Sequence, residues 1–286
     1  MNNLINPTSS QSELPEIVLE PPHGWLDLRL RQLWFYRELL YFFIWRDLKV
    51  RYKQTVLGAT WAILQPVLTM IVFSIVFGKL ANIKPPDGIP YPVFSYAALL
   101  PWQLFSGALA NASSSLVINQ SLVTKVYFPR ILLPLASVLS GLVDFGIAFI
   151  VLLGLMIYYH ITPTWAVLFL PLFILLALAT ALAVSLWLSA FNVKYRDFKY
   201  MIPFLLQFWM YATPIAYPST LIPEKWRLVF GLNPMAGVVG GFRWALLGMK
   251  AEVAPLLILA VIIVVILLTS GLIYFQRMEQ TFADVI

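Results

Sequence analysis

Long apolar segments alternate with short polar ones along most of the chain. A membrane-spanning helix needs roughly 20 apolar residues to cross a hydrocarbon core of about 30 Å. Six segments come close to that length or exceed it. The predicted spans cover residues 56–77, 94–119, 131–159, 165–191, 201–217 and 253–275. The pattern therefore predicts a polytopic, all-helical membrane protein.

The segment before the first span also has a helical pattern. Leu30, Leu33, Leu40, Ile44 and Leu48 recur every three to four residues or multiples of that spacing, and basic residues gather on another face. Its apolar run, 39–45, is too short to cross a membrane. An amphipathic helix with aromatic side chains and a basic face lies in the membrane interface. We expect such a helix over residues 25–53.

Residues 218–252 do not fit a crossing, because charges, glycines and Pro234 interrupt every apolar run there. Two short helices that enter the membrane and return, packed against protein, fit this pattern better. The predicted fold is thus six transmembrane helices, an N-terminal amphipathic interface helix and re-entrant helices before the last span. Three parts follow: a flexible acidic cytoplasmic tail at 1–24, the interface helix at 25–53 and the transmembrane domain at 54–286.

Composition strengthens the membrane assignment and adds an orientation. The chain is 60% hydrophobic and only 11% charged, whereas soluble domains average about 25% charged residues. With both termini in the cytoplasm, thirteen Lys and Arg residues lie inside and six outside, as the positive-inside rule requires. The net charge of +6 is explained by orientation signals and contacts with lipid headgroups, so no nucleic acid is expected as a partner.

The sequence lacks the residues that several kinds of chemistry require. The phosphate-binding pattern Gly-x-x-x-x-Gly-Lys-Ser/Thr does not occur, so an ATPase that drives transport must be another chain. The chain has no cysteine, and His23 and His160 are too far apart in the sequence to indicate a metal site. Acids outside the predicted spans are scattered. We therefore expect a transport protein that is not an enzyme and binds no cofactor or metal itself.

Asp144 is an acid in the middle of a predicted span, where a charge costs about 2.5–3.5 kcal/mol on insertion scales. It could face a pore, relay protons or pair with a cation. It could also be a packing residue that is protonated or hydrogen-bonded to Ser137, Ser140 or a neighbouring helix. Because a relay needs several ionisable groups and the other core spans supply none, the packing interpretation is favoured.

Two further groups of residues have both an ordinary and a functional interpretation. Segment 125–130, KVYFPR, is either an inside loop with interfacial aromatics or a docking site for a soluble partner. Tryptophan, tyrosine and amide side chains in the spans are either interfacial anchors or the lining of a pathway for a neutral, sugar-rich substrate. The channel-lining candidates are Trp61, Gln65, Trp102, Phe105, Asn111, Gln207, Trp209 and Tyr211.

Three stretches of sequence resemble one family. They are RDLKVRYKQTVLGATWAILQPVL (46–68), LLPWQLFSGALANASSSLVINQSLVTKVYFPRILLPLASV (99–138) and LNPMAGVVGGFRWALLG (232–248). In this order they are similar to the membrane subunit of ABC-2 type exporters of O-antigen, capsule or teichoic-acid polymers. The resemblance covers roughly residues 34–275.

The resemblance implies a homodimeric permease in the bacterial inner (cytoplasmic) membrane, paired with two separate ATP-binding cassette subunits that hold ATP and magnesium. The substrate would be a lipid-linked polysaccharide of lipopolysaccharide biosynthesis. The interface helix and segment 125–130 would contact the ATPase, and the first, second and fifth spans would line the channel. The implied contact residues are Arg37, Glu38, Arg46, Asp47, Arg51, Lys125, Tyr127, Phe128, Pro129 and Arg130.

Three alternatives remain open at this point. An ABC-2 exporter of a small drug or lipid shares the fold, although the short loop at 79–92 offers no extracellular domain of the kind some such exporters carry. A membrane glycosyltransferase or ligase acting on lipid-linked sugar would need a group of outward acids, which the sequence lacks. A gradient-driven flippase would need more ionisable groups than Asp144.

Overall fold

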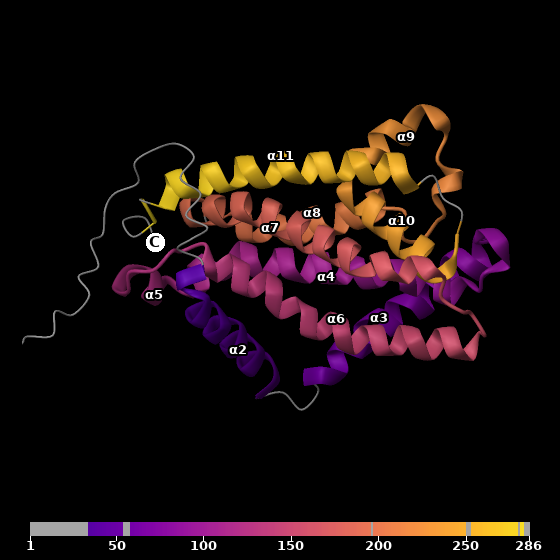
Figure 1. The fold of residues 1–286 in the computed structure, drawn as a ribbon, viewed down its shortest axis with the longest axis horizontal. Helices are drawn as coiled ribbons and strands as arrows, with labels where there is room; N and C mark the ends of the chain where they lie inside the picture. Colours follow the sequence, from indigo (N-terminus) through magenta and orange to yellow (C-terminus); the bar gives the residue numbers. More distant parts are fainter. Residues whose placement is uncertain (1–33, 54–57, 196, 250–252, 280, 283–286) are drawn as a thin grey trace, which may run out of the picture.

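The computed structural model describes residues 34–53, 58–195, 197–249, 253–279 and 281–282. Within these ranges the chain forms helices, turns and loops and no strand, in agreement with the predicted all-α class. Figure 1 shows the long helices running along the long axis of the molecule. The predicted tail at 1–24 and the first part of the predicted interface helix, 25–33, lie outside the described residues.

Five helical segments of the described chain are long and apolar enough to cross a membrane. They are α3 (Gly58–Phe73) with its continuation Ser74–Leu80, α4 (Tyr91–Ile118), α6 (Leu132–Tyr158), the turn Trp165–Phe169 with α7 (Leu170–Lys194), and α11 (Val253–Glu279). Each corresponds to a predicted span. The fifth predicted span is represented by α8 (Phe198–Ala212), whose 15 residues extend only about 22 Å. A sixth crossing therefore stays a prediction.

Helix α4 forms the centre of the bundle and packs chiefly against α6 and α7. In its most apolar stretch, 78% of the residues are buried. The hydroxyls of Ser113 and Ser115, which are buried in α4, donate to carbonyls of the same helix at 2.5 and 2.7 Å. These two hydroxyls thus need no partner from another helix. Helix α11 covers α7 and α10 (Pro234–Leu247) on the other side (Figure 1).

Two short helices, α9 (Glu224–Gly231) and α10, occupy the region for which re-entrant helices are predicted. Helix α10 begins with Asn233, whose side chain caps the backbone N–H of Met235 at 3.0 Å. It approaches α7 closely, since a Cβ on Gly241 would lie 2.5 Å from the ring of Phe173. The short helices are as predicted, and their re-entrant placement in the membrane stays a prediction.

The backbone after α8 is held by what we call the Arg243 clamp: Arg243, Tyr91 and segment 214–217. Arg243 is 4% exposed, and its guanidinium donates to the carbonyls of Pro214, Ile215 and Tyr217. The Tyr91 hydroxyl donates to the carbonyl of Ala216 at 2.6 Å. Four consecutive carbonyls outside any helix are thereby satisfied. Helix α8 ends at Ala212 and not at the predicted 217, because Pro214 after the C-cap Thr213 cannot continue the helix, and the clamp satisfies the carbonyls that follow.

Candidate functional site

Helix α2 (Arg37–Lys53) is the described part of the predicted interface helix, and it lies obliquely against the bundle in Figure 1. One side packs through Phe43, which is 3% exposed, while large aromatic side chains point away from the protein. The exposed aromatics are Trp34, Phe35, Tyr41, Phe42 and Trp45. The Lys49 ammonium lies 4.6 Å from the ring centre of Trp45. Exposed aromatics beside cations are typical of a helix at a membrane surface.

The C-terminal half of α2 is fastened to α6 by polar contacts that we call the α2 junction: Asp47, Arg51 and Tyr52 with Ser137 and Asp144. Arg51 forms an ion pair with Asp144, and the Tyr52 hydroxyl donates to the same carboxylate. One turn earlier, the Ser137 hydroxyl lies 3.4 Å from an oxygen of Asp47. Burial, and then the bond to Asp144, raises the pKa of Tyr52 to about 12, so this phenol remains a donor at neutral pH.

Asp144 is therefore a hydrogen-bonded residue paired with a cation. The predicted partners Ser137 and Ser140 do not contact its carboxylate, because Ser137 faces Asp47 and Ser140 donates to its own helix. The partner is Arg51, far away in sequence. Since α2 brings the cation to α6, the acid lies inside a span without being an isolated charge.

Segment 125–130 connects α5 (Gln120–Lys125) to α6 and contains both internal and exposed side chains. Phe128 is 5% exposed and packs on Phe43 of α2, with ring centres 5.5 Å apart. The backbone N–H of Arg130 donates to a carboxylate oxygen of Glu279 at 2.7 Å, and its guanidinium bonds the carbonyl of the same residue. Tyr127, which precedes Phe128 in the chain, is 63% exposed.

The predicted ATPase contacts thus divide into two sets. Arg37, Glu38, Lys125 and Tyr127 are exposed. The other predicted contacts are half-buried or buried, and most of them bond or pack within the chain. These internal residues are Arg46, Asp47, Arg51, Phe128, Pro129 and Arg130. The structure brings α2 and segment 125–130 together through Phe43 and Phe128.

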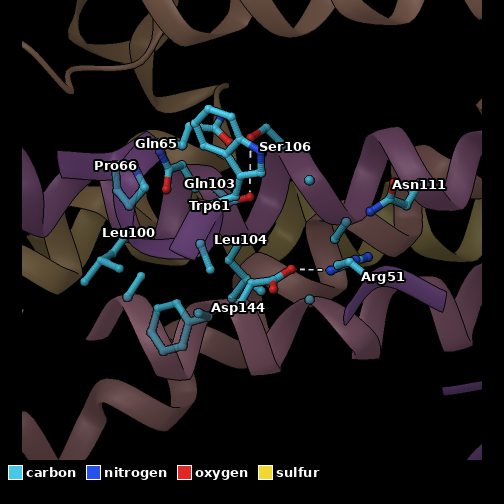
Figure 2. Close-up of a pocket in the computed structure, with 16 residues that line it drawn as sticks. Arg51, Trp61, Gln65, Pro66, Leu100, Gln103, Leu104, Ser106, Asn111 and Asp144 are labelled. Carbon is cyan, nitrogen blue, oxygen red and sulfur yellow. Dashed lines mark hydrogen bonds and ion pairs between the residues drawn. The ribbon is translucent and has the colours of Figure 1, made fainter. Parts of the chain in front are cut away.

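A cavity of about 380 Å³ lies beside the α2 junction, between α3, α4 and α6. Figure 2 shows Trp61 and Gln65 of α3 close to Gln103 and Ser106 of α4, with the ion pair of Arg51 and Asp144 across the cavity. Neutral polar side chains line one part of it. They are Gln65, Gln103, Ser106 and Asn111. The apolar part of the lining comes mainly from leucine, alanine, proline and aromatic residues of α3, α4 and α6.

The predicted channel residues separate by position. Trp61, Gln65 and Asn111 line this cavity, and Gln207 and Tyr211 are exposed on α8. Phe105 is fully buried and its ring centre lies 4.9 Å from that of Trp209. Trp209 is half-buried and donates to Asn233 at 2.8 Å, and Trp102 is 4% exposed. These three aromatics pack inside the protomer, so a channel-lining role for them stays a prediction without support from their positions.

Three further residues line the cavity but were not among the channel-lining residues predicted from the sequence. Gln103 and Ser106 lie one helical turn apart on α4, and Gly107 adds an open wall with no atom within 4 Å of an added Cβ. Amide spacing on one helix face could have indicated Gln103 together with Asn111, eight residues apart. The part played by Asp144 could not be read this way, because its partner is on another helix.

Comparisons with known proteins agree on one family. Residues 38–247 match the profile of the ABC-2 type transporter family. An O-antigen export system permease protein RfbA from Myxococcus xanthus is 34% identical over 254 residues, 88% of this chain and 96% of the relative. Its Klebsiella pneumoniae counterpart is 28% identical, covering 84% and 92%. The polysialic acid transport protein KpsM of Escherichia coli is 26% identical, covering 82% and 91%.

Proposed function

The chain belongs to the ABC-2 type transporter family, and we propose that it is the permease subunit of an ATP-driven exporter of lipid-linked, O-antigen-like polysaccharide. The similarity over most of the chain to two O-antigen export permeases and one polysialic acid transport protein carries this proposal. The chain is a transport subunit and not an enzyme. The membrane would be the bacterial inner membrane, with both termini cytoplasmic.

The working unit would be a homodimer with two ATP-binding cassette subunits, which would bind ATP and magnesium. The exposed side chains Arg37, Glu38, Lys125 and Tyr127 supply charge and one aromatic anchor for that contact. Interfaces often depend on a few tyrosine and arginine side chains. This surface lies at the end of the bundle that also carries α5 and the end of α11 (Figure 1).

Movement of the ATPase would reach the spans through two links. The α2 junction connects the interface helix to α6, and Arg130 connects segment 125–130 to the end of α11 through Glu279. Both links consist of half-buried polar contacts. Since such contacts can exchange with water at modest cost, they are suited to a joint that changes geometry during the ATP cycle.

Deletion of the gene tests this function. Polymer made in the cytoplasm should then accumulate on its carrier lipid, and surface polysaccharide should disappear, as measured by immunoblot and by proteolysis-resistant surface labelling. The full chain together with its ATPase should restore export, while the same pair with a hydrolysis-defective ATPase should not. Normal surface polysaccharide in the deletion strain, with loss of a small lipid or drug efflux instead, would favour the alternative exporter.

A further inference from the structure

Helix α8 packs on the bundle along one narrow stripe. Within the described residues of this helix only Ile202 is buried, and Leu206, Trp209 and Met210 lie half-buried on the same face. The large apolar side chains exposed on the rest of its surface are Met201, Phe204, Leu205, Phe208 and Tyr211. Because the rotation of a helix is normally set by side chains that interdigitate with a neighbour, so small a stripe fixes the rotation of α8 weakly. Another contact is needed to hold it.

Asn233, the residue before α10, binds the C-terminal end of α8 through both atoms of its amide. Its Oδ1 accepts from the indole Nε1 of Trp209 at 2.8 Å and from the backbone N–H of Met235 at 3.0 Å. Its Nδ2 donates to the hydroxyl of Thr213 at 2.9 Å and to the carbonyl of Ala212 at 3.3 Å. An amide offers two lone pairs and two N–H groups, so all four are used.

These bonds exceed what a helix N-cap requires. Capping of α10 uses the bond from the Met235 N–H, and asparagine is common at N-caps for this reason alone. The other three bonds go to α8. Thr213 is the C-cap of that helix and is 1% exposed, and its hydroxyl accepts from Asn233 while it donates to the Trp209 carbonyl at 2.8 Å. Capping alone therefore does not account for Asn233.

Trp209 carries the connection further into the bundle. Its ring centre lies 4.9 Å from that of the fully buried Phe105 of α4, in an edge-on arrangement. An indole has a single N–H, and Asn233 accepts it, so the tryptophan is fixed through both its polar and its apolar parts. One amide thus joins α10 to α8, and one ring joins α8 to α4.

We infer that Asn233 is a positioning residue, which fixes the rotation and depth of α8 against α10 and α4. It differs from the Arg243 clamp, because the clamp holds the backbone after α8 whereas Asn233 acts on the helix itself. The inference rests on the proposed function and adds a requirement to it. Helix α8 must keep its place on α10 while the ATP cycle moves the α2 junction.

Thiol labelling measures the position of α8 directly, because the chain contains no cysteine. Asn233→Ser keeps an N-cap residue but removes the amide. Trp209→Phe removes the indole N–H, while it keeps an aromatic ring and leaves the cap intact. In both backgrounds Met210→Cys reports on the packed stripe of α8. Leu257→Cys, at a half-buried residue of α11 that packs on the same core, is the matched control.

The reaction would be followed in membrane vesicles that contain the partner ATPase. N-ethylmaleimide should react with M210C about fivefold faster in either background than in a chain with the native Asn233 and Trp209. Loss of one typical hydrogen bond raises the population of a locally opened state by about that factor. The reaction rate of L257C should not change.

Export gives the second readout. N233S and W209F should each export about fivefold less polymer at wild-type protein level, with the ATPase retained on purification. The double variant should export no less than N233S alone, because both substitutions remove the same bond. Trp244→Phe, at a half-buried tryptophan of α10 whose ring packs on Trp165 and Phe169, should export normally.

The outcomes separate positioning from capping and from the proposed function. Equal labelling of M210C in all backgrounds, or normal export by both single variants, overturns the positioning role. Faster labelling of both M210C and L257C would show a general loss of stability and would overturn it as well. If N233S does not accumulate, W209F decides, because it leaves the N-cap in place. If the deletion strain exports polymer without the chain, the proposed function fails, while the labelling rates still show whether Asn233 holds α8.

Discussion

The Arg243 clamp lies at the end of the bundle where α4 begins, whereas the α2 junction fastens α2 along the half of α6 that leads to the other end. Each fixes a helix with an arginine. Arg243 is 4% exposed and donates only to backbone carbonyls, whereas the side chains of Arg51 and Asp144 are 29% and 33% exposed. Carbonyls of a packed backbone cannot leave their donor without unfolding, but a half-exposed ion pair can exchange with water. The difference indicates that the end of the bundle held by Arg243 is rigid, which we call the rigid end. The end that carries α2 and segment 125–130 can change its geometry, and we call it the adjustable end.

The largest effect is expected at the rigid end. Arg243→Met would leave the carbonyls of Phe94, Pro214, Ile215 and Tyr217 without this donor. At about 1–3 kcal/mol for each buried group left unpaired, stability should fall by about 4 kcal/mol or more. Heating followed by size-exclusion chromatography in detergent would measure it. Lys225→Met, at an exposed site, should change nothing. A wild-type unfolding temperature for R243M would contradict a rigid clamp.

At the adjustable end, aromatic packing should matter more than charge. Phe128→Ala removes the ring that packs on Phe43, and deletion of a buried phenylalanine typically costs about 3 kcal/mol or more. The unfolding temperature should fall, and ATPase binding should weaken only in proportion to the folded fraction. Co-purification of the ATPase at several temperatures separates the two effects. Loss of binding at full stability would instead make Phe128 a direct docking residue, as the sequence resemblance implies.

The boundaries of most helices could be read from the sequence, because charge and apolar length depend on neighbours along the chain. The last span was predicted at 253–275 and α11 covers Val253–Glu279; the second was predicted at 94–119 and α4 covers Tyr91–Ile118. The end of α8 also has a local signal, because Pro214 follows the C-cap Thr213 and cannot continue the helix. The path of segment 214–217 after it could not be predicted in this way, since Arg243 reaches its carbonyls from another helix.

The direction in which each side chain faces was also beyond the sequence. Trp102 and Asn111 belong to the same helix and were both predicted to line the channel, but Trp102 is buried while Asn111 faces the cavity. A helix in a bundle lacks the plain polar and apolar faces of a surface helix, so its rotation follows from packing. For the same reason, the sequence around Asp144 does not identify Arg51 as its partner.

The ion pair of the α2 junction should contribute less than either contact above. Asp144→Leu would remove the acceptor for Arg51 and Tyr52, at about 1–2 kcal/mol for a half-exposed site. A double-mutant cycle with Arg51→Leu should show coupling, because the second substitution removes a charge that the first left without its acid. Unfolding temperatures of the four proteins measure this. Strictly additive effects would show that the pair does not hold α2 to α6, and the adjustable end would then depend on packing alone.

The smallest change in stability, and the clearest change in partner binding, should come from Tyr127→Ala. Tyr127 is 63% exposed beside the buried Phe128, and exposed substitutions usually alter stability by less than about 0.5 kcal/mol. If this tyrosine anchors the ATPase, its loss should weaken the complex by about tenfold, equivalent to about 1.4 kcal/mol. Tyr158→Ala, at a 74% exposed tyrosine of the other end, should leave the affinity unchanged. Quantitative pull-down of the ATPase against both variants decides whether the adjustable end is also the docking end, since equal affinities would place the ATPase elsewhere on the protein.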